Sequence, residues 1–97
     1  MKTKQKYLHV KIEGQSEIGV IDLGKIKHFD MPESDYKKII EPKLIEMLKE
    51  HFDYNVKIRT LSSFRSTMPI QMEYIVVIES DENDYAETVL LEETWMY

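Results

Sequence analysis

The order of hydrophobic patterns along this chain of 97 residues predicts an α+β fold, β-β-α-β-β-β, with one helix packed on one face of a mainly antiparallel sheet. Two segments that alternate between apolar and polar residues come before a stretch with helical spacing, and three strand-like segments follow it. Hydrophobic residues make up 42% and charged residues 32% of the chain, which is typical of a folded globular protein. We expect one small domain over residues 1–97.

The first two strands are predicted to form a hairpin. Residues 8–12 alternate between apolar and polar side chains, which is the pattern of a strand with one buried face. Gly14 follows where a tight turn is expected, and residues 18–26 form the second strand. The apolar phase of this second strand slips between Val20 and Ile21, so we expect a β-bulge there.

The central segment, from about Pro32 to Phe52, has the spacing of a helix that faces a core. Residues 30–33 have the composition of a helix start, since proline is tolerated in the first turn. Pro42 removes one backbone donor in the middle of the segment. Because the apolar phase does not change across Pro42, we expect a helix that is kinked or broken there but keeps one face on the core. The apolar stripe consists of Tyr36, Ile39, Ile40, Leu44, Met47, Leu48 and Phe52.

Three more strands are expected after the helix, and the helix crossover makes the third strand parallel to the second if both lie in one sheet. The fourth strand contains a run that is apolar on both faces, which favours the middle of the sheet, where both faces can be covered. The fifth strand is expected at an accessible edge. The predicted segments are a strand over 54–59, a polar loop over 61–69, a strand over 70–80, a turn over 81–84 and a strand from 85 to about 93, extending at most to 96.

Charge is distributed very unevenly between the two ends of the chain. The first 65 residues contain all 13 Lys and Arg and 10 of the 18 Asp and Glu, whereas the last 32 contain 8 acids and no base. The net charge is therefore +3 in the first part and −8 in the second, which together give −5. Such an asymmetry bears on partners and on association rates rather than on the fold.

The leading hypothesis for function is a small, acidic, non-enzymatic module for protein interaction or regulation. The acidic C-terminal hairpin would bind a protein partner with a basic surface, or the last strand would pair with a second copy as a homodimer. Tryptophan and tyrosine at the chain end support this hypothesis, because both are enriched at interfaces. The candidate partner-binding residues are Asp81, Glu82, Asp84, Glu92, Glu93, Trp95 and Tyr97.

The alternative is a domain that binds a small anion or ligand, or an enzyme, using residues 59–67. Hydroxyl groups beside guanidinium groups can hold a phosphate or another anion. The candidate anion-binding residues are Arg59, Ser62, Ser63 and Arg65. No glycine accompanies them, so a phosphate-binding glycine loop is not expected. An ordinary polar loop explains the same composition.

No residue pattern predicts catalysis or a metal. The histidines, His9, His28 and His51, lie far apart in the sequence and have no partners at a metal-ligand spacing. Calcium binding by the segment that begins at Asp81 is not expected, because Ala86 occupies the position where an EF-hand loop needs glycine. There is no cysteine, which excludes a thiolate nucleophile and a disulfide framework. We therefore expect no cofactor and no metal.

Nucleic acid and membranes are not expected as partners. The chain as a whole is acidic, whereas phosphate contacts need a concentrated basic face. The longest apolar run, residues 74–78, is far too short to cross a membrane. The basic residues near the N-terminus are not followed by the apolar stretch of a signal peptide, so the sequence predicts a cytoplasmic protein.

Overall fold

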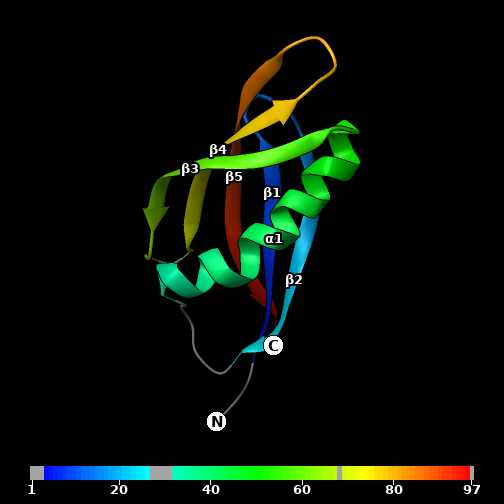
Figure 1. The fold of residues 1–97 in the computed structure, drawn as a ribbon. Helices are drawn as coiled ribbons and strands as arrows, with labels where there is room; N and C mark the ends of the chain where they lie inside the picture. Colours follow the sequence, from blue (N-terminus) through cyan, green and yellow to red (C-terminus); the bar gives the residue numbers. More distant parts are fainter. Residues whose placement is uncertain (1–3, 27–31, 68, 97) are drawn as a thin grey trace.

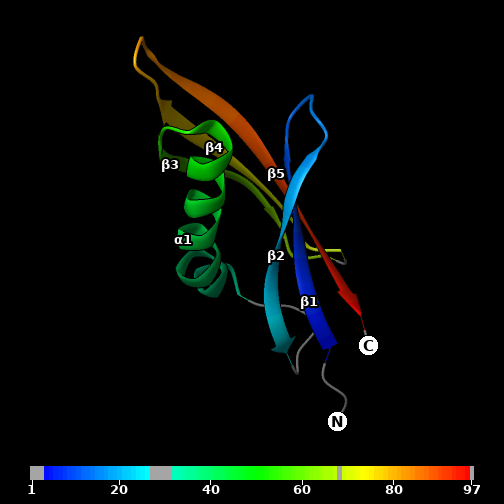
Figure 2. The same cartoon turned by 90° about the vertical axis from the view of Figure 1, so that its right-hand side faces the viewer.

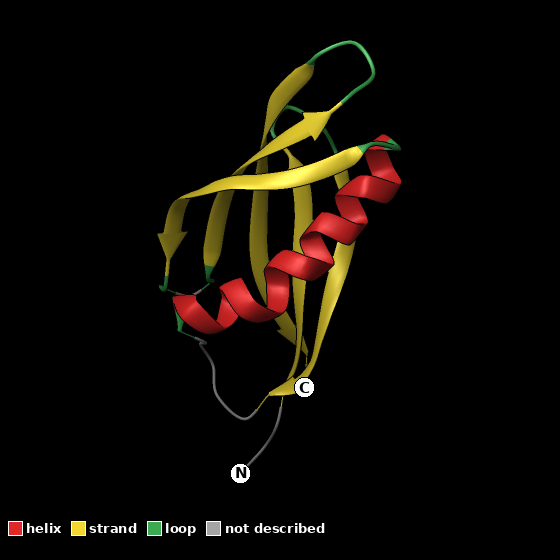
Figure 3. Cartoon of the chain, in the orientation of Figure 1, coloured by secondary structure: helices red, strands yellow, loops and turns green. Residues whose placement is uncertain are grey.

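The computed structural model describes residues 4–26, 32–67 and 69–96, and it confirms the predicted α+β fold. One helix packs on a five-stranded antiparallel sheet (Figures 1 and 3). The elements are β1 (Lys4–Ile12), β2 (Glu17–Ile26), α1 (Glu33–Phe52), β3 (Asn55–Arg65), β4 (Gln71–Glu79) and β5 (Asp84–Met96).

The strands lie in the order β2-β1-β5-β4-β3, so β5 is the central strand. The expectation that the C-terminal strand lies at an edge is wrong, because β5 pairs with β1 on one side and with β4 on the other. Strand-like residues reveal that a strand exists but not which strands become its neighbours. The edge strands are β2 and β3. Four antiparallel pairings separate them in the sheet, and an even number of reversals makes these two strands run parallel to each other.

The polar loop expected over 61–69 is wrong for residues 61–65, because β3 continues through them to Arg65. Register shifts in the pairing with β4 leave Arg59 and Ser62 as extra residues of β3. Each bulge changes the phase of the alternation. Leu61 and Phe64 therefore still pack on the core, although the sequence no longer reads as a simple alternation.

The bulge expected at Val20–Ile21 is also misplaced. The pairing of β1 with β2 shifts at two other places, where Ile18 and Leu23 are the extra residues of β2. Gly24 follows the second shift with φ of 76°, a left-handed conformation that glycine adopts without strain. All the register shifts thus fall in pairings of the two edge strands, and irregular edges resist the addition of further strands.

The helix runs without a break through Pro42, and its axis changes direction along its length (Figure 1). Asp30, in the expected helix start, lies outside the described residues, and Pro32 occupies the N-cap position. Ile40, Leu44 and Leu48 are fully buried against the sheet, as predicted, whereas Phe52 is half-buried. The described helix is not long and apolar enough to cross a membrane.

The helix covers one face of the sheet and leaves the other face open. Along β4 the residues alternate between buried and half-buried, so the expectation that both faces of this strand are covered is wrong. Tyr74 points to the covered side and donates a hydrogen bond of 2.8 Å to Oε2 of Glu41 on the helix. Burial, together with this carboxylate, raises the pKa of Tyr74 well above its usual range.

A buried ion pair lies at the junction of β1, β5 and the helix. Nζ of Lys6 is 3.3 Å from Oε1 of Glu93, and both side chains are 1% exposed. This contact is an ionic attraction without hydrogen-bond geometry, since Oε1 has no hydrogen-bond partner. Tyr36 on the helix donates a hydrogen bond to the other carboxylate oxygen. The cluster therefore ties the first strand, the last strand and the helix together.

We predict that Leu44→Ala and Leu48→Ala each lower the free energy of unfolding by about 2–5 kcal/mol, because each leaves a cavity under the helix. Urea unfolding followed by circular dichroism measures the change. Ile39→Ala is the matched control, because Ile39 is on the same helix but 44% exposed, and it should change stability far less. Equal losses at all three positions would contradict the assignment of the buried face.

Lys6→Met should lower stability by about 3–5 kcal/mol, because it leaves the buried carboxylate of Glu93 without its counter-charge. Glu93→Leu should also lower stability, because it removes both the negative charge beside Lys6 and the acceptor of the Tyr36 hydroxyl. The double variant Lys6→Met/Glu93→Leu should be more stable than either single variant, since no uncompensated charge remains. Chemical unfolding of the four proteins tests this, and losses that simply add in the double variant would refute the pairing.

Candidate functional site

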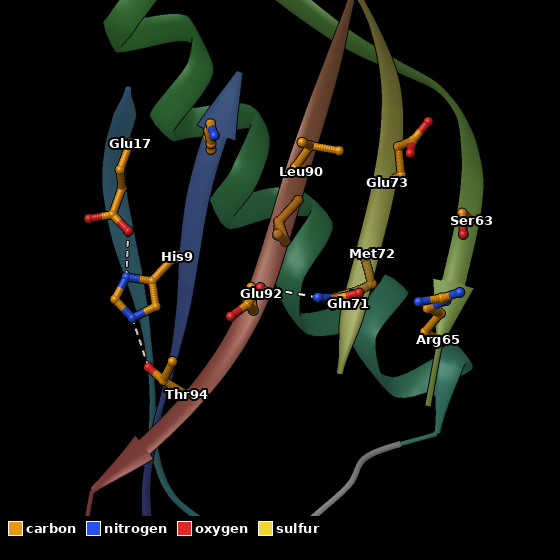
Figure 4. A pocket seen from close by; sticks show the side chains of 12 residues that line it. His9, Glu17, Ser63, Arg65, Gln71, Met72, Glu73, Leu90, Glu92 and Thr94 are labelled. Atoms are coloured by element: carbon orange, nitrogen blue, oxygen red, sulfur yellow. Dashed lines mark hydrogen bonds and ion pairs between the residues drawn. The ribbon is translucent and has the colours of Figure 1, made fainter. Parts of the chain in front are cut away.

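The open face of the sheet carries a groove of about 770 Å³ that crosses all five strands (Figure 4). It lies on the side away from the helix. Its lining residues are His9, Lys11, Glu17, Ser63, Arg65, Gln71, Met72, Glu73, Leu90, Leu91, Glu92 and Thr94. A concave surface with several polar groups is the usual form of a ligand site.

His9 is held between an acid and a hydroxyl group on neighbouring strands. Its Nδ1 is 2.5 Å from Oε1 of Glu17 on β2, and its Nε2 is 2.8 Å from Oγ1 of Thr94 on β5 (Figure 4). A carboxylate can only accept, so Nδ1 carries a proton in this contact. In neutral His9, Nε2 is then left as an acceptor for the threonine hydroxyl.

The sequence of groups, carboxylate, imidazole and hydroxyl, is that of an activated nucleophile. Two features limit its catalytic power. The side chains of His9 and Glu17 are 38% and 48% exposed, so water competes with any reaction. Thr94 also lies within strand β5 rather than at a helix N-terminus or in a turn, where the backbone donors of an oxyanion hole are usually found. The arrangement orients His9 but does not by itself indicate an enzyme.

The groove contains both signs of charge. Lys11 and Arg65 supply positive charge on β1 and β3, and Glu73 and Glu92 supply negative charge between them on β4 and β5. Nε2 of Gln71 donates a hydrogen bond of 3.1 Å to Oε2 of Glu92. A ligand that fits here needs both positive and negative groups, because a simple anion near Arg65 would also meet these carboxylates.

The structure places two of the four candidate anion-binding residues in the groove and two outside it. Ser63 and Arg65 line the groove, on the open face of β3. Arg59 and Ser62 are the bulge residues of the same strand and do not line it. The groove therefore brings together half of the predicted set and adds His9, Glu17 and Thr94, which the sequence did not connect because they come from three different strands.

The candidate partner-binding residues occupy several environments. Asp81, Glu82 and Asp84 are exposed at the tip of the β4–β5 hairpin, and Glu92 lies in the open-face groove. Glu93 points into the core, where it pairs with Lys6, so it is not available at the surface. Trp95 is half-buried on β5, and Tyr97 lies outside the described residues.

The turn of the β4–β5 hairpin projects at the top of Figure 1, while β3 lies beside β4 as far as Glu79. The described residues measure 52 × 24 × 21 Å, so the molecule is elongated. Five acids and no base occur between Glu79 and Glu87. Within the described part of the chain, Glu79 is the one acid of this group with an ion pair, 3.6 Å from Lys57. The hairpin is thus a negatively charged projection.

Two contacts brace the hairpin near its turn. The backbone N–H of Asn83 donates a hydrogen bond of 3.2 Å to the hydroxyl of Ser80. In the second residue pair from the turn, Tyr85 packs edge-on against Phe52 at the helix end, with ring centroids 6.4 Å apart. Tyr85 nevertheless stays 40% exposed. An ordered projection with an exposed aromatic ring is suited to contact with another molecule.

No protein-family model, curated protein or solved structure matches this chain. Its function is therefore inferred from the geometry and charge of its own surfaces.

We predict that the neutral ring of His9 carries its proton on Nδ1, because Glu17 accepts from that atom. Nitrogen-15 NMR of the imidazole distinguishes the two tautomers. Glu17→Ala should shift the population toward the Nε2–H form, which is the commoner one in water, whereas Glu13→Ala, an exposed acid in the adjacent turn, should leave it unchanged. A wild-type ring already protonated on Nε2 would show that the Glu17 contact does not persist in solution.

Proposed function

We propose that this protein is a small, non-enzymatic interaction module, and that its acidic β4–β5 hairpin is the contact surface for a protein partner with a basic patch. The observation that carries the proposal is the projection of a braced hairpin on which four acids are in no ion pair among the described residues: Asp81, Glu82, Asp84 and Glu87. Such a surface costs stability through the repulsion of like charges. A role in binding offsets that cost.

The charge distribution supports fast, oriented association. The opposite end of the sheet carries exposed bases such as Lys25, so the molecule is electrically polarised. A basic partner is attracted to the hairpin end and repelled from the other end, which raises the association rate at low salt. Exposed Tyr85 beside the acids supplies apolar contact once the partner has arrived.

The proposal predicts that Asp81→Lys/Glu82→Lys abolishes capture of the partner that the wild-type protein retains from a lysate of its own cells. Glu46→Lys/Glu50→Lys is the control, because both residues are exposed on the helix and the net charge changes by the same amount. With the captured partner purified, the association rate should fall as salt rises. Equal binding by the hairpin variant and the wild type would refute the proposal, as would an equal loss in the control.

A second candidate function is binding of a small ligand in the open-face groove. The observation that favours it is the convergence of Ser63, Arg65 and the oriented ring of His9 on one hollow. Because the lining carries both charges, free amino acids and dipeptides are the appropriate probes. Binding should shift the NMR signals of these three residues and leave Asp81 and Glu82 unaffected. No shift at millimolar ligand would eliminate this candidate.

A further inference from the structure

The first residues of the central strand, β5, have no paired strand on the side that faces β1. Pairing between β1 and β5 begins at Ile12 and Val89, and the last bond along this side runs from N–H of Glu13 to C=O of Thr88, at 2.9 Å. Beyond this point the β1 chain turns back at Gly14. Figure 2 shows the β1–β2 and β4–β5 hairpins diverging from here. The segment Asp84–Thr88 therefore has a neighbour, β4, on one side only.

The backbone groups on the open side can be assigned from the ladder. In an antiparallel strand the N–H and C=O of one residue point to the same side, and successive residues point to opposite sides. C=O of Thr88 bonds toward β1, whereas N–H of Glu93 bonds toward the β4 side, to Ile70. Residues 84 and 86 consequently direct their N–H and C=O groups to the open side, and Thr88 directs its N–H there. Among the described residues none of these five groups has a backbone partner.

We propose that this segment accepts a short, extended, basic peptide as an additional β-strand, in line with β1. The inference rests on the proposed function and specifies how the partner binds. Backbone donors and acceptors at regular spacing are what β-strand addition requires. The segment spans roughly 14 Å, enough for about four or five residues of a partner. The outer edges β2 and β3 are poorer templates, because each carries two bulges.

Charge on both faces of the segment selects a basic peptide. Asp84 lies on the open face of the sheet, and Glu87 lies on the helix side. Glu13 is exposed beside Thr88, to which its N–H is bonded. Lysine or arginine side chains of an added strand would therefore meet an acid on either face. A second copy of β5 would bring the same acids together and is disfavoured for that reason.

The apolar positions of the peptide also have a defined contact. Tyr85 is 40% exposed on the helix side of the segment and rests against Phe52. An aliphatic side chain at an alternate position of the added strand packs on this ring. The expected motif is thus extended, with basic and aliphatic residues mixed and without proline at the positions that pair.

The test uses a synthetic peptide of alternating lysine and valine, and a second peptide of the same sequence and charge with every backbone nitrogen methylated, so that neither edge of the strand can donate. Binding to the full chain is measured by calorimetry. The unmethylated peptide should bind at least about tenfold more tightly, since methylation removes the donors that an added strand needs. Equal affinity would overturn strand addition while leaving a purely electrostatic role of the hairpin intact. No binding of either peptide would also overturn it, and the capture experiment above would then decide the proposed function alone.

A protein variant gives an independent readout. Ala86→Pro removes an N–H that points to the open side and leaves the ladder with β4 complete. It should reduce the affinity for the unmethylated peptide to that for the methylated one. Ala86→Val is the control, because it keeps the N–H, and it should bind like wild type. Unchanged binding by a folded Ala86→Pro protein would overturn the inference, and the peptide pair keeps it falsifiable if this variant does not fold.

Discussion

The pairing of the first strand with the last is the interaction on which the rest of this structure depends. Without the ladder between β1 and β5, the β1–β2 hairpin and the β3–β4–β5 meander would be separate sheets, each too small to bury the helix. Leu8 and Val10 on β1 meet Val89 and Leu91 on β5 in the core below the helix. The ion pair of Lys6 with Glu93 lies on the same ladder. A buried pair of this kind favours one register of pairing, because a shifted register leaves a charge uncompensated.

The same ladder explains the two surfaces that carry the functional proposals. β5 has 13 residues, whereas β1 has 9 and β4 has 9, and the two neighbours are staggered along it. β4 reaches the first residues of β5, but β1 does not, so the acidic start of β5 projects with one side open. Further along the face, from Val89 to Glu92, β5 is paired on both sides. His9, Glu17 and Thr94 meet on this face because β1 lies between β2 and β5.

Much of the fold is evident from local patterns, whereas the candidate site is not. The stripe through Ile40, Leu44 and Leu48 predicted the helix and its buried face, since helical spacing is set within a few residues. The part of β3 around Leu61 and Phe64 was missed because two bulges break the alternation that identifies a strand. The central place of β5 depends on partners in β1 that lie 77 to 91 positions away, as between Leu8 and Glu93, and no local pattern contains that information. The acidic hairpin was foreseeable from charge alone, but its open side follows only from the stagger of the strands.

Amide hydrogen exchange along β5 in the free protein tests whether this strand is central in the sheet and open on one side at its start. We expect an alternation at the start of the strand, with slow exchange at Tyr85 and Glu87, which bond to β4, and fast exchange at Asp84, Ala86 and Thr88. From Val89 to Glu93 every amide should exchange slowly, because both sides are paired there. Fast exchange throughout 89–93 would contradict the central position of β5. Protection of residues 84, 86 and 88 equal to that of 85 and 87 would show that the open side does not exist in solution.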